Sequence, residues 1–158
     1  MRIWRQDCSQ TFCWMPVKAH NLWAVGAKNT VPEMLVRSGL HRLGFRFRLH
    51  SPNLPGKPDL HLSKYNLALF IHGCFWHGHD CHLFKWPKTR PEFWKNKIER
   101  NKTRDQRQID QLIESNIRVG IVWECSLKGK TRFTAEFFFE QLVGYIESDL
   151  SFFELYST

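Results

Sequence analysis

The feature that most constrains this chain is a run of metal-ligand residues between positions 72 and 82. It reads H-G-C-F-W-H-G-H-D-C-H and holds two cysteines, four histidines, one aspartate and two large aromatic residues in eleven positions. Thiolate and imidazole groups at such short spacing are typical of a tetrahedral metal such as zinc, whose ligand atoms converge on one point at about 2 Å. We therefore expect the chain to fold around a metal site.

A third cysteine extends the ligand set beyond this run. Cys74 and Cys81 belong to the run, and Cys125 follows an apolar segment much later in the chain. Three thiolates and one imidazole make a closed, four-coordinate zinc site of the structural kind. The alternative is three buried free thiols beside surface histidines, but the density of ligands favours zinc. By spacing alone, either His77 or His79 fits as the fourth ligand.

The charge and the aromatic content indicate a nucleic-acid partner. Lys and Arg exceed Asp and Glu by eight, the pI is about 9.5, and 15% of the residues are aromatic. A basic, aromatic-rich composition is typical of proteins that bind DNA or RNA. The N-terminus lacks the apolar core of a secretory signal, and no apolar run is long enough to span a membrane. We therefore expect an intracellular, cytoplasmic protein.

The 158 residues suffice for one domain with its own core. Residues 1–27 show no clear hydrophobic period and are expected to form an irregular arm, so the domain is predicted over residues 28–158. A helix is predicted from about 31 to 43, because Thr30-Val-Pro-Glu33 has a capping-box pattern. The alternation of apolar and basic residues over 45–50 predicts a strand with one basic face.

The rest of the domain alternates between strands and helices. Residues 59–62 and 67–71 are predicted to pair as a hairpin, whose second and wholly apolar strand is central and buried. Residues 91–114 predict one long helix, residues 118–124 a buried strand, and residues 134–148 a last helix with an apolar face. This order predicts an α/β fold with a mixed central sheet flanked by helices.

A carboxylate at the start of one predicted strand is a candidate magnesium ligand. Asp59 follows a proline-rich loop, and the neighbouring strand ends at Ile71-His72. One aspartate, a main-chain carbonyl and waters form an ordinary magnesium shell when a phosphate completes it, although an aspartate in this place is more often a turn residue. His72 and His77 are left over once the zinc ligands are assigned. A histidine near a scissile phosphate can exchange protons, so one of them is a candidate catalytic residue.

Residues 85–107 form the most basic part of the chain. They hold nine cationic and three acidic residues, interleaved with Trp86, Phe93 and Trp94. A solvated helix face is the ordinary explanation, but the neighbouring Phe75-Trp76 pair favours a surface that contacts phosphates and stacks on bases. Large aromatic side chains can also enter between base steps, where unstacking is easiest at a mismatch.

Several segments together resemble the very short patch repair (Vsr) DNA mismatch endonucleases. They are G-K-P-D59, F-I-H-G-C-F-W-H-G-H-D-C-H, T-R-P-E-F-W94, N-K-T-R-D105 and V-W-E-C125, with K-N-T-V-P-E33 at the start of the domain. The resemblance covers roughly residues 28–128 in matching order and spacing. It implies a restriction-endonuclease-like fold and a magnesium-dependent nick 5′ of the thymine in a T·G mismatch, which arises when 5-methylcytosine is deaminated.

The resemblance also implies partners and residue roles. The substrate is expected to be double-stranded DNA with a T·G mismatch. The enzyme is expected to act as a monomer, with downstream repair proteins as further partners. The implied catalytic residues are Asp59, His77, His72, Glu33 and Asp105. His77 is the implied acid/base, His72 is implied to hydrogen-bond near the phosphate or the hydrated metal, and Glu33 and Asp105 are implied to have supporting positions. The implied magnesium ligands are Asp59 and the main-chain carbonyl of Ile71. The implied zinc ligands are Cys74, His79, Cys81 and Cys125, and the implied DNA wedge is Phe75, Trp76 and Trp94.

Two features depart from the family pattern. Ile71 stands where a threonine is familiar, and residues 1–27 lack a basic lead-in. Cys8 and Cys13 have no counterpart in that pattern.

Two other functions are alternatives to mismatch repair. The first is a site-specific restriction or nicking endonuclease of the same fold that acts on paired DNA. The second is a non-catalytic, zinc-dependent DNA-binding module. A comparison of nicking on paired and mismatched duplexes separates the first, and metal-dependent turnover excludes the second.

Overall fold

The computed structural model describes residues 29–158. The expected arm over residues 1–27, and with it Cys8 and Cys13, lies outside the described residues. From Val31 onward the elements are α1 (Val31–Arg42), β1 (Arg48–Leu49), β2 (Leu60–Leu62), η1 (Ser63–Tyr65), β3 (Leu67–His72), α2 (Pro91–Glu114), β4 (Arg118–Trp123), η2 (Glu124–Ser126), α3 (Ala135–Glu147) and β5 (Phe152–Leu155). None of the helices in this part combines the length and the apolar character that a membrane crossing demands.

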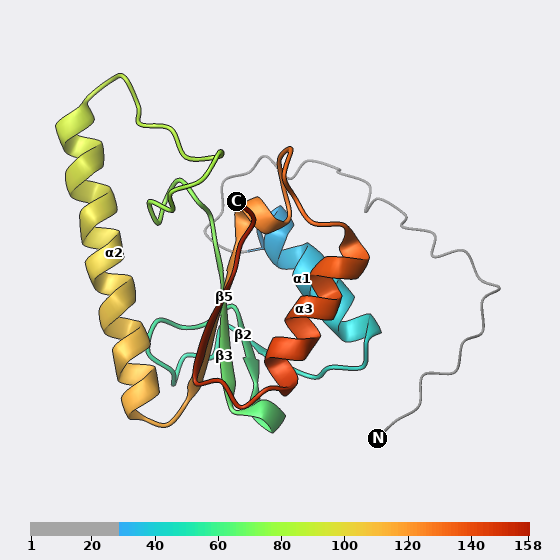
Figure 1. Cartoon of the computed structure of the whole chain (residues 1–158). Helices are drawn as coiled ribbons and strands as arrows, with labels where there is room; N and C mark the ends of the chain where they lie inside the picture. Colours follow the sequence, from blue (N-terminus) through green and yellow to red (C-terminus); the bar gives the residue numbers. More distant parts are fainter. Residues whose placement is uncertain (1–28) are drawn as a thin grey trace. The chain divides into compact units, whose positions relative to one another are not determined.

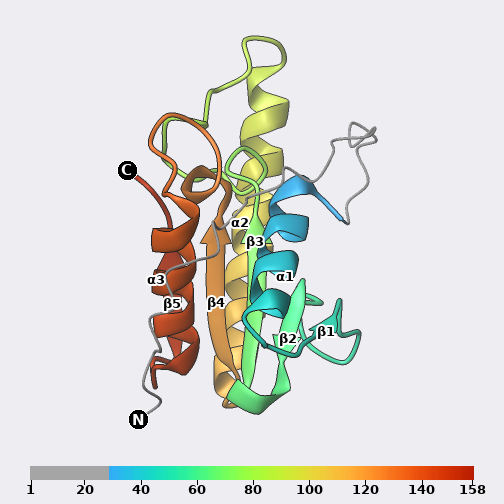
Figure 2. The same ribbon diagram turned by 90° about the vertical axis from the view of Figure 1, so that its right-hand side faces the viewer.

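The strands form one mixed sheet in the order β1-β2-β3-β4-β5. The first three are antiparallel neighbours, whereas β3, β4 and β5 run parallel. In Figure 1 the sheet is seen edge-on, with α2 on one face and α1 and α3 on the other; Figure 2 shows α1 and α3 in front of it. The predicted α/β class, the mixed sheet and the flanking helices are confirmed.

Strand β3 divides the core between the two faces of the sheet. All six of its residues are buried, as predicted for a central apolar strand. Leu67, Leu69 and Ile71 pack with residues of α1 and α3, while Ala68 and Phe70 pack with residues of α2. Because side chains alternate along a strand, the last residue, His72, lies on the α2 face. The same alternation that builds the core therefore places an imidazole at the end of the strand.

The predicted strand over residues 45–50 is wrong in its extent. Only Arg48–Leu49 pairs with β2. Gly44 has a φ of +88°, and Phe45 N–H donates to the carbonyl of Leu40 at 3.0 Å. This is the pattern of a helix that ends in a left-handed glycine followed by an apolar residue. Phe45 consequently closes α1 and is buried in the core, so the apparent alternation there reflects a helix end.

The last strand was not predicted from the sequence. β5 follows α3 and pairs in parallel with β4, and it buries Phe153 and Leu155. Four residues at the end of a chain give too short an alternation to separate from a loop, and the partner strand is distant in sequence. Gly120 of β4 makes the pairing feasible, because a Cβ at that position would lie 2.3 Å from the Phe153 ring.

The remaining elements agree with the prediction within a residue or two. The hairpin of β2 and β3, the long helix α2, the buried strand β4 and the helix α3 are confirmed. Thr134 caps α3, since its Oγ1 accepts a hydrogen bond from the Phe137 N–H at 3.3 Å. Arg118 joins β4 to the other end of that helix by donating to the carbonyls of Tyr145 and Ile146 at 2.8 and 2.9 Å. The capping box at Thr30 stays a prediction.

Candidate active site and metal centre

The loop after β3 carries the metal-ligand residues and is folded tightly. His77 N–H donates to the carbonyl of Gly73, and His79 N–H donates to the carbonyl of Cys74 at 3.0 Å. Gly78 between the two histidines has a φ of +61°, and a Cβ there would lie 2.6 Å from the Ile98 side chain of α2. A glycine is required by both the conformation and the close approach. The turn separates His77 from His79 and brings each into a different cluster.

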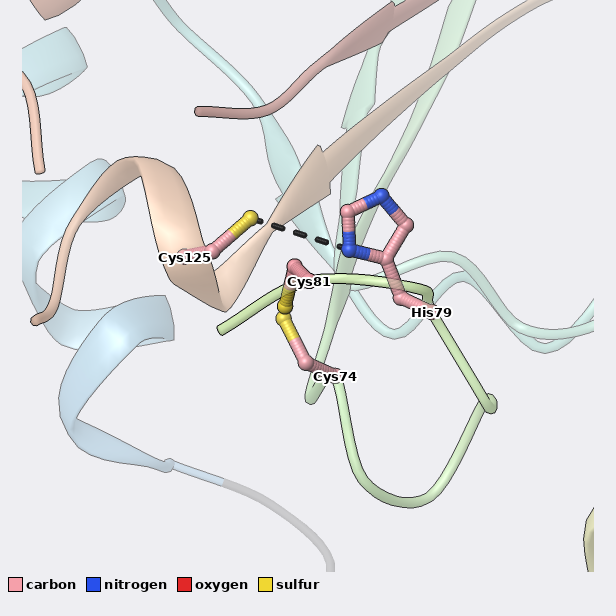
Figure 3. A group of neighbouring side chains, drawn as sticks. All are labelled: Cys74, His79, Cys81 and Cys125. Carbon is pink, nitrogen blue, oxygen red and sulfur yellow. Dashed lines mark hydrogen bonds between the residues drawn. The ribbon is translucent and has the colours of Figure 1, made fainter. Parts of the chain in front are cut away.

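The first cluster, here called the thiol cluster, consists of Cys74, His79, Cys81 and Cys125. The first three come from the loop and Cys125 comes from η2, directly after β4. Their ligand atoms all lie within 4.8 Å of one another, and Figure 3 shows the four side chains converging. Cys125 Sγ is 3.7 Å from His79 Nδ1, and the three cysteines are free thiols. Such a set has the composition and proximity to hold a metal ion in four-fold coordination.

Electrostatics within the thiol cluster favour a negative charge on one sulfur. A hydrogen bond from the Cys74 thiol lowers the pKa of Cys125 to about 5, with the Ser157 backbone N–H adding to the effect against the opposing influence of burial. The same contact with Cys125, together with burial, raises the pKa of Cys74. Both cysteines are 0% exposed. A buried thiolate among further thiols is an environment that a soft cation stabilises.

The second cluster, here called the imidazole cluster, consists of His72, His77 and Asp105. The rings of His72 and His77 stack with centroids 3.8 Å apart and an interplanar angle of 5°. His77 Nδ1 is 2.5 Å from Asp105 Oδ2, which projects from α2. The three side chains again bring ligand-type atoms within 4.8 Å of one another. Two histidines that are close in sequence and an aspartate of α2, which is 28 positions after His77, therefore meet at the end of β3.

The charges of the imidazole cluster are unequal. Burial, reinforced by the nearby His77, lowers the pKa of His72 to about 3, so its ring is neutral at physiological pH. Burial alone would raise the pKa of Asp105, but the hydrogen bond and the charge of His77 outweigh it and lower that pKa. Asp105 is thus an ionised carboxylate that fixes Nδ1 of His77. The opposite nitrogen, Nε2, is left as the atom that can exchange a proton.

Asp59 lies at the start of β2 and belongs to the same site. Its Oδ2 accepts a hydrogen bond from the Ile71 N–H at 2.8 Å. Burial raises the pKa of Asp59 to about 6 despite that bond; the charge of Glu33 adds to the rise, whereas Arg37 and His77 oppose it. The contact observed with Ile71 uses its N–H, and the expected role of its carbonyl stays a prediction.

Glu33 reaches this site from α1. Its Oε2 accepts a hydrogen bond from Arg37 Nη2 at 3.1 Å, and both side chains are buried. The same Nη2 lies 3.0 Å from His50 Nε2, and His50 Nδ1 lies 3.8 Å from Asp59 Oδ1. The five expected catalytic residues therefore belong to one network. His72, His77 and Asp105 are in contact, and the charges of Glu33 and His77 act on Asp59. Arg37 and His50 were missed, although Arg37 sits four residues after Glu33 on the same helix face.

The expected wedge residues form one aromatic patch. The rings of Phe75 and Trp76 are 5.2 Å apart, and those of Phe75 and Trp94 are 5.3 Å apart. Trp76 is 45% exposed, and the ammonium group of Lys97 lies 5.8 Å from its ring. On α2 a basic hollow of about 500 Å³ is lined by Asn96, Glu99, Arg100, Thr103, Arg104 and Arg107. Flat apolar rings beside clustered cations suit a nucleic acid.

Comparison with known proteins identifies the family. A sequence model described as DNA mismatch endonuclease Vsr matches residues 17–83. The chain is 43% identical over 129 residues to the DNA mismatch endonuclease Vsr of Escherichia coli strain K12, which covers 82% of this chain and 83% of that protein. The chain belongs to the Vsr DNA mismatch endonuclease family. The match to the Vsr model spans Glu33, Asp59, His72 and His77.

Other relatives of this Vsr-family chain are named as nicking enzymes. It is 52% identical over 103 residues to the Type II nicking enzyme V.XorIIP of Xanthomonas oryzae pv. oryzae, covering 65% of this chain and 76% of that protein. It is 45% identical over 106 residues to the Type II nicking enzyme V.NmeAIP of Neisseria meningitidis serogroup A, covering 67% and 76%. The chain is therefore an endonuclease that acts on DNA, and the alternative of a non-catalytic module loses its support.

Trp123 joins the two clusters of this Vsr-family site and was not singled out from the sequence. Its ring stacks on His79 with centroids 4.2 Å apart at 18°. It also presents an edge contact to His72 at 5.3 Å and to His77 at 6.3 Å. The residue ends β4 and is 8% exposed. The thiol cluster and the imidazole cluster thus share one rigid aromatic wall.

The C-terminal residues close over the thiol cluster. The Ser157 hydroxyl donates to the Cys125 carbonyl at 2.7 Å, and it lies 3.2 Å from Thr131 Oγ1. The ring of Tyr156 makes an edge contact with His79 at 5.4 Å. Sequence reasoning missed these residues because it placed no element after the last helix. The unpredicted strand β5 is what carries them to the cluster.

Proposed function

We propose that this enzyme nicks double-stranded DNA 5′ of the thymine in a T·G mismatch that arises from deamination of 5-methylcytosine. One observation supports the proposal most directly: the loop after β3 carries His77 of the imidazole cluster and also Phe75 and Trp76 of the aromatic patch. Residues suited to proton transfer and residues suited to base stacking are therefore neighbours in the chain. The name of the Escherichia coli relative, a DNA mismatch endonuclease, supports the same substrate.

The thiol cluster fits zinc. Three thiols and one imidazole from two segments converge without a disulfide, and their softness matches zinc better than a hard cation. We assign Cys74, His79, Cys81 and Cys125 as the ligands. Four protein ligands fill the tetrahedral coordination of zinc and leave no position for substrate, so we propose a structural role for the ion. The site joins the loop to the end of β4 on what we take to be a restriction-endonuclease-like fold.

The carboxylate end of the site fits magnesium. Asp59 offers oxygen ligands in a largely buried position, and Glu33 adds negative charge nearby. We assign Asp59 and the carbonyl of Ile71 as the protein ligands, to be completed by DNA phosphate and water. When bound, magnesium supplies Lewis-acid polarisation of the scissile phosphate and charge stabilisation for the leaving oxygen.

His77 is proposed as the residue that moves a proton. Asp105 holds Nδ1, so Nε2 can exchange a proton with water or with the leaving oxygen at the scissile phosphate. His72 is neutral and stacks on His77, which restricts the rotation of that ring and offers a hydrogen bond near the phosphate. The contacts of each side chain support its proposed role.

The aromatic patch is proposed as the element that senses the mismatch. Phe75, Trp76 and Trp94 would enter beside the T·G pair, where unstacking costs a few kcal/mol and costs least at a weakly paired step. The cations of α2 would contact phosphates without reading sequence. One active site suffices for one nick, so we propose that the monomer acts alone before later repair proteins arrive inside the cell.

The deciding experiment is strand cleavage of two labelled duplexes, one with a T·G mismatch in a cytosine-methylation context and one fully paired. Each is incubated with Mg²⁺ and with EDTA. Nicking of the mismatched duplex only, and only with Mg²⁺, is the expected result. Equal cutting of both duplexes would instead support a site-specific nicking enzyme, which the names of V.XorIIP and V.NmeAIP favour.

A further inference from the structure

Arg37 and His50 connect two acidic residues that approach the site from different elements. Arg37 Nη2 lies 3.1 Å from Glu33 Oε2 and 3.0 Å from His50 Nε2. The other ring nitrogen of His50, Nδ1, lies 3.8 Å from Asp59 Oδ1. Glu33 and Arg37 are 3% and 8% exposed, so this row of side chains is largely shielded from water. The row runs from α1 to the carboxylate at the start of β2.

The chemistry of the row fixes the state of His50. A guanidinium group has donors only, so Nε2 of His50 must accept the hydrogen bond from Arg37. Nδ1, the nitrogen that faces Asp59, then carries a proton. It is directed at Asp59 Oδ1 from 3.8 Å, a longer separation than that of a direct hydrogen bond, while the Ile71 N–H bonds the other oxygen at 2.8 Å.

The backbone of His50 is built for this placement. Its φ is +46°, a left-handed conformation that residues other than glycine adopt infrequently. Its N–H also donates to the carbonyl of Asp59 at 3.3 Å. The histidine is thus bonded to Asp59 through the main chain and faces it through the ring.

Arg37 supplies the charge that the two carboxylates require. Glu33 and Asp59 each act on the other as like charges, and Arg37 opposes that repulsion at Asp59. Two buried carboxylates without a counter-charge would turn apart or take up protons. The Arg37 guanidinium contacts Glu33 directly and acts on Asp59 as a favourable positive charge.

We propose that Arg37 and His50 are positioning residues that hold Asp59 in the orientation that binds the catalytic divalent cation. The inference rests on the proposed magnesium-dependent function. Neither residue needs to touch the reacting atoms, because each acts through Asp59. Residues that orient a metal ligand in this way commonly change metal affinity by about 10- to 100-fold when they are removed.

The test compares His50→Ala and Arg37→Met with the wild-type enzyme. The variants should need about 10- to 100-fold more Mg²⁺ for half-maximal nicking of a T·G duplex, while the rate at saturating Mg²⁺ stays within about three-fold. His50→Asn keeps an N–H donor near Asp59 and tolerates the left-handed backbone, so it should restore most of the affinity. Exposed residues of α1 supply the matched controls, His41→Ala and Arg42→Met, which should leave Mg²⁺ dependence unchanged.

A second measurement is independent of nicking. Binding of Mn²⁺ to each purified protein, followed by loss of the free-ion electron paramagnetic resonance signal, should weaken in His50→Ala and Arg37→Met alone. Normal Mn²⁺ binding with normal Mg²⁺ dependence would overturn the proposal, as would a loss of rate that saturating Mg²⁺ does not restore. A wild-type protein that binds Mn²⁺ but never nicks would contradict the proposed function instead. Should Arg37→Met not fold, the two His50 variants decide the matter.

Discussion

The thiol cluster and the imidazole cluster share Trp123 as a wall, yet they differ in how their polar atoms are used. Each combines buried and half-buried side chains: Cys74 and Cys125 are buried beside half-buried His79 and Cys81, and His72 is buried beside half-buried His77 and Asp105. The thiol cluster has four converging ligands and is covered by the C-terminal residues, while the imidazole cluster retains a nitrogen for proton exchange. We propose that similar residue types serve stability in the closed thiol cluster and chemistry in the imidazole cluster.

The largest effect is expected in the enclosed cluster. Cys125→Ser removes a thiolate from the proposed zinc site, and zinc binding of this kind contributes on the order of 10 kcal/mol to folding. That is comparable with the whole stability of a small domain, so the variant should be mostly unfolded at 37 °C and lack zinc. Circular dichroism melting and metal analysis by mass spectrometry would show it. A variant that loses zinc but melts like wild type would remove the distinction between the clusters.

For Asp59 we expect the opposite result: a substitution should abolish most of the nicking activity and leave the stability of the fold intact. Asp59→Asn keeps the shape and an oxygen that can accept the Ile71 N–H, but it removes the charge that would bind magnesium. Nicking of a T·G duplex should fall by about 10³-fold, because several kcal/mol of transition-state stabilisation are lost. The melting temperature should hold or rise, since burial already disfavours the charge at this position. Single-turnover nicking and thermal melting are the measurements, and normal nicking would refute the assignment.

His77 and Asp105 are expected to act as one unit. His77→Ala should reduce single-turnover nicking by about 10²- to 10⁴-fold, and Asp105→Asn by about 10- to 100-fold. Because Asp105 works by orienting His77, the double variant should be no worse than His77→Ala alone. Effects that multiply in the double variant would show that Asp105 has a separate role.

The sequence predicted those parts of the fold whose signals are local. Pro91 and the helix formers after it mark the start and the length of α2, and the apolar run before His72 marks β3. The density of cysteine and histidine likewise indicated a metal centre before any geometry was known. The sheet order and β5 could not be derived in the same way, because they depend on pairing between distant segments.

The finer assignments in the site required distances. Spacing left His77 and His79 equivalent, whereas the turn at Gly78 groups His79 with the cysteines and His77 with Asp105. Trp123 read as a core residue of a buried strand, and only its ring contacts show that it lies between the clusters. Arg37 had an ordinary explanation as the salt-bridge partner of Glu33. Contacts of this kind join segments that no periodicity connects.

The smallest predicted effect concerns the cover of the thiol cluster. Ser157→Ala removes the hydrogen bond to the Cys125 carbonyl, which is worth about 1 kcal/mol. Zinc release to a chromogenic chelator should accelerate about five-fold, with a fall of roughly 2–8 °C in melting temperature. Ser148→Ala is the matched control, because Ser148 donates a similar bond at 2.8 Å to the carbonyl of Tyr145. It should lower the melting temperature by a comparable amount without changing zinc release. Equal release rates in the two variants would mean that the C-terminal residues contribute only general stability, and that the coordination bonds alone keep the thiol cluster closed.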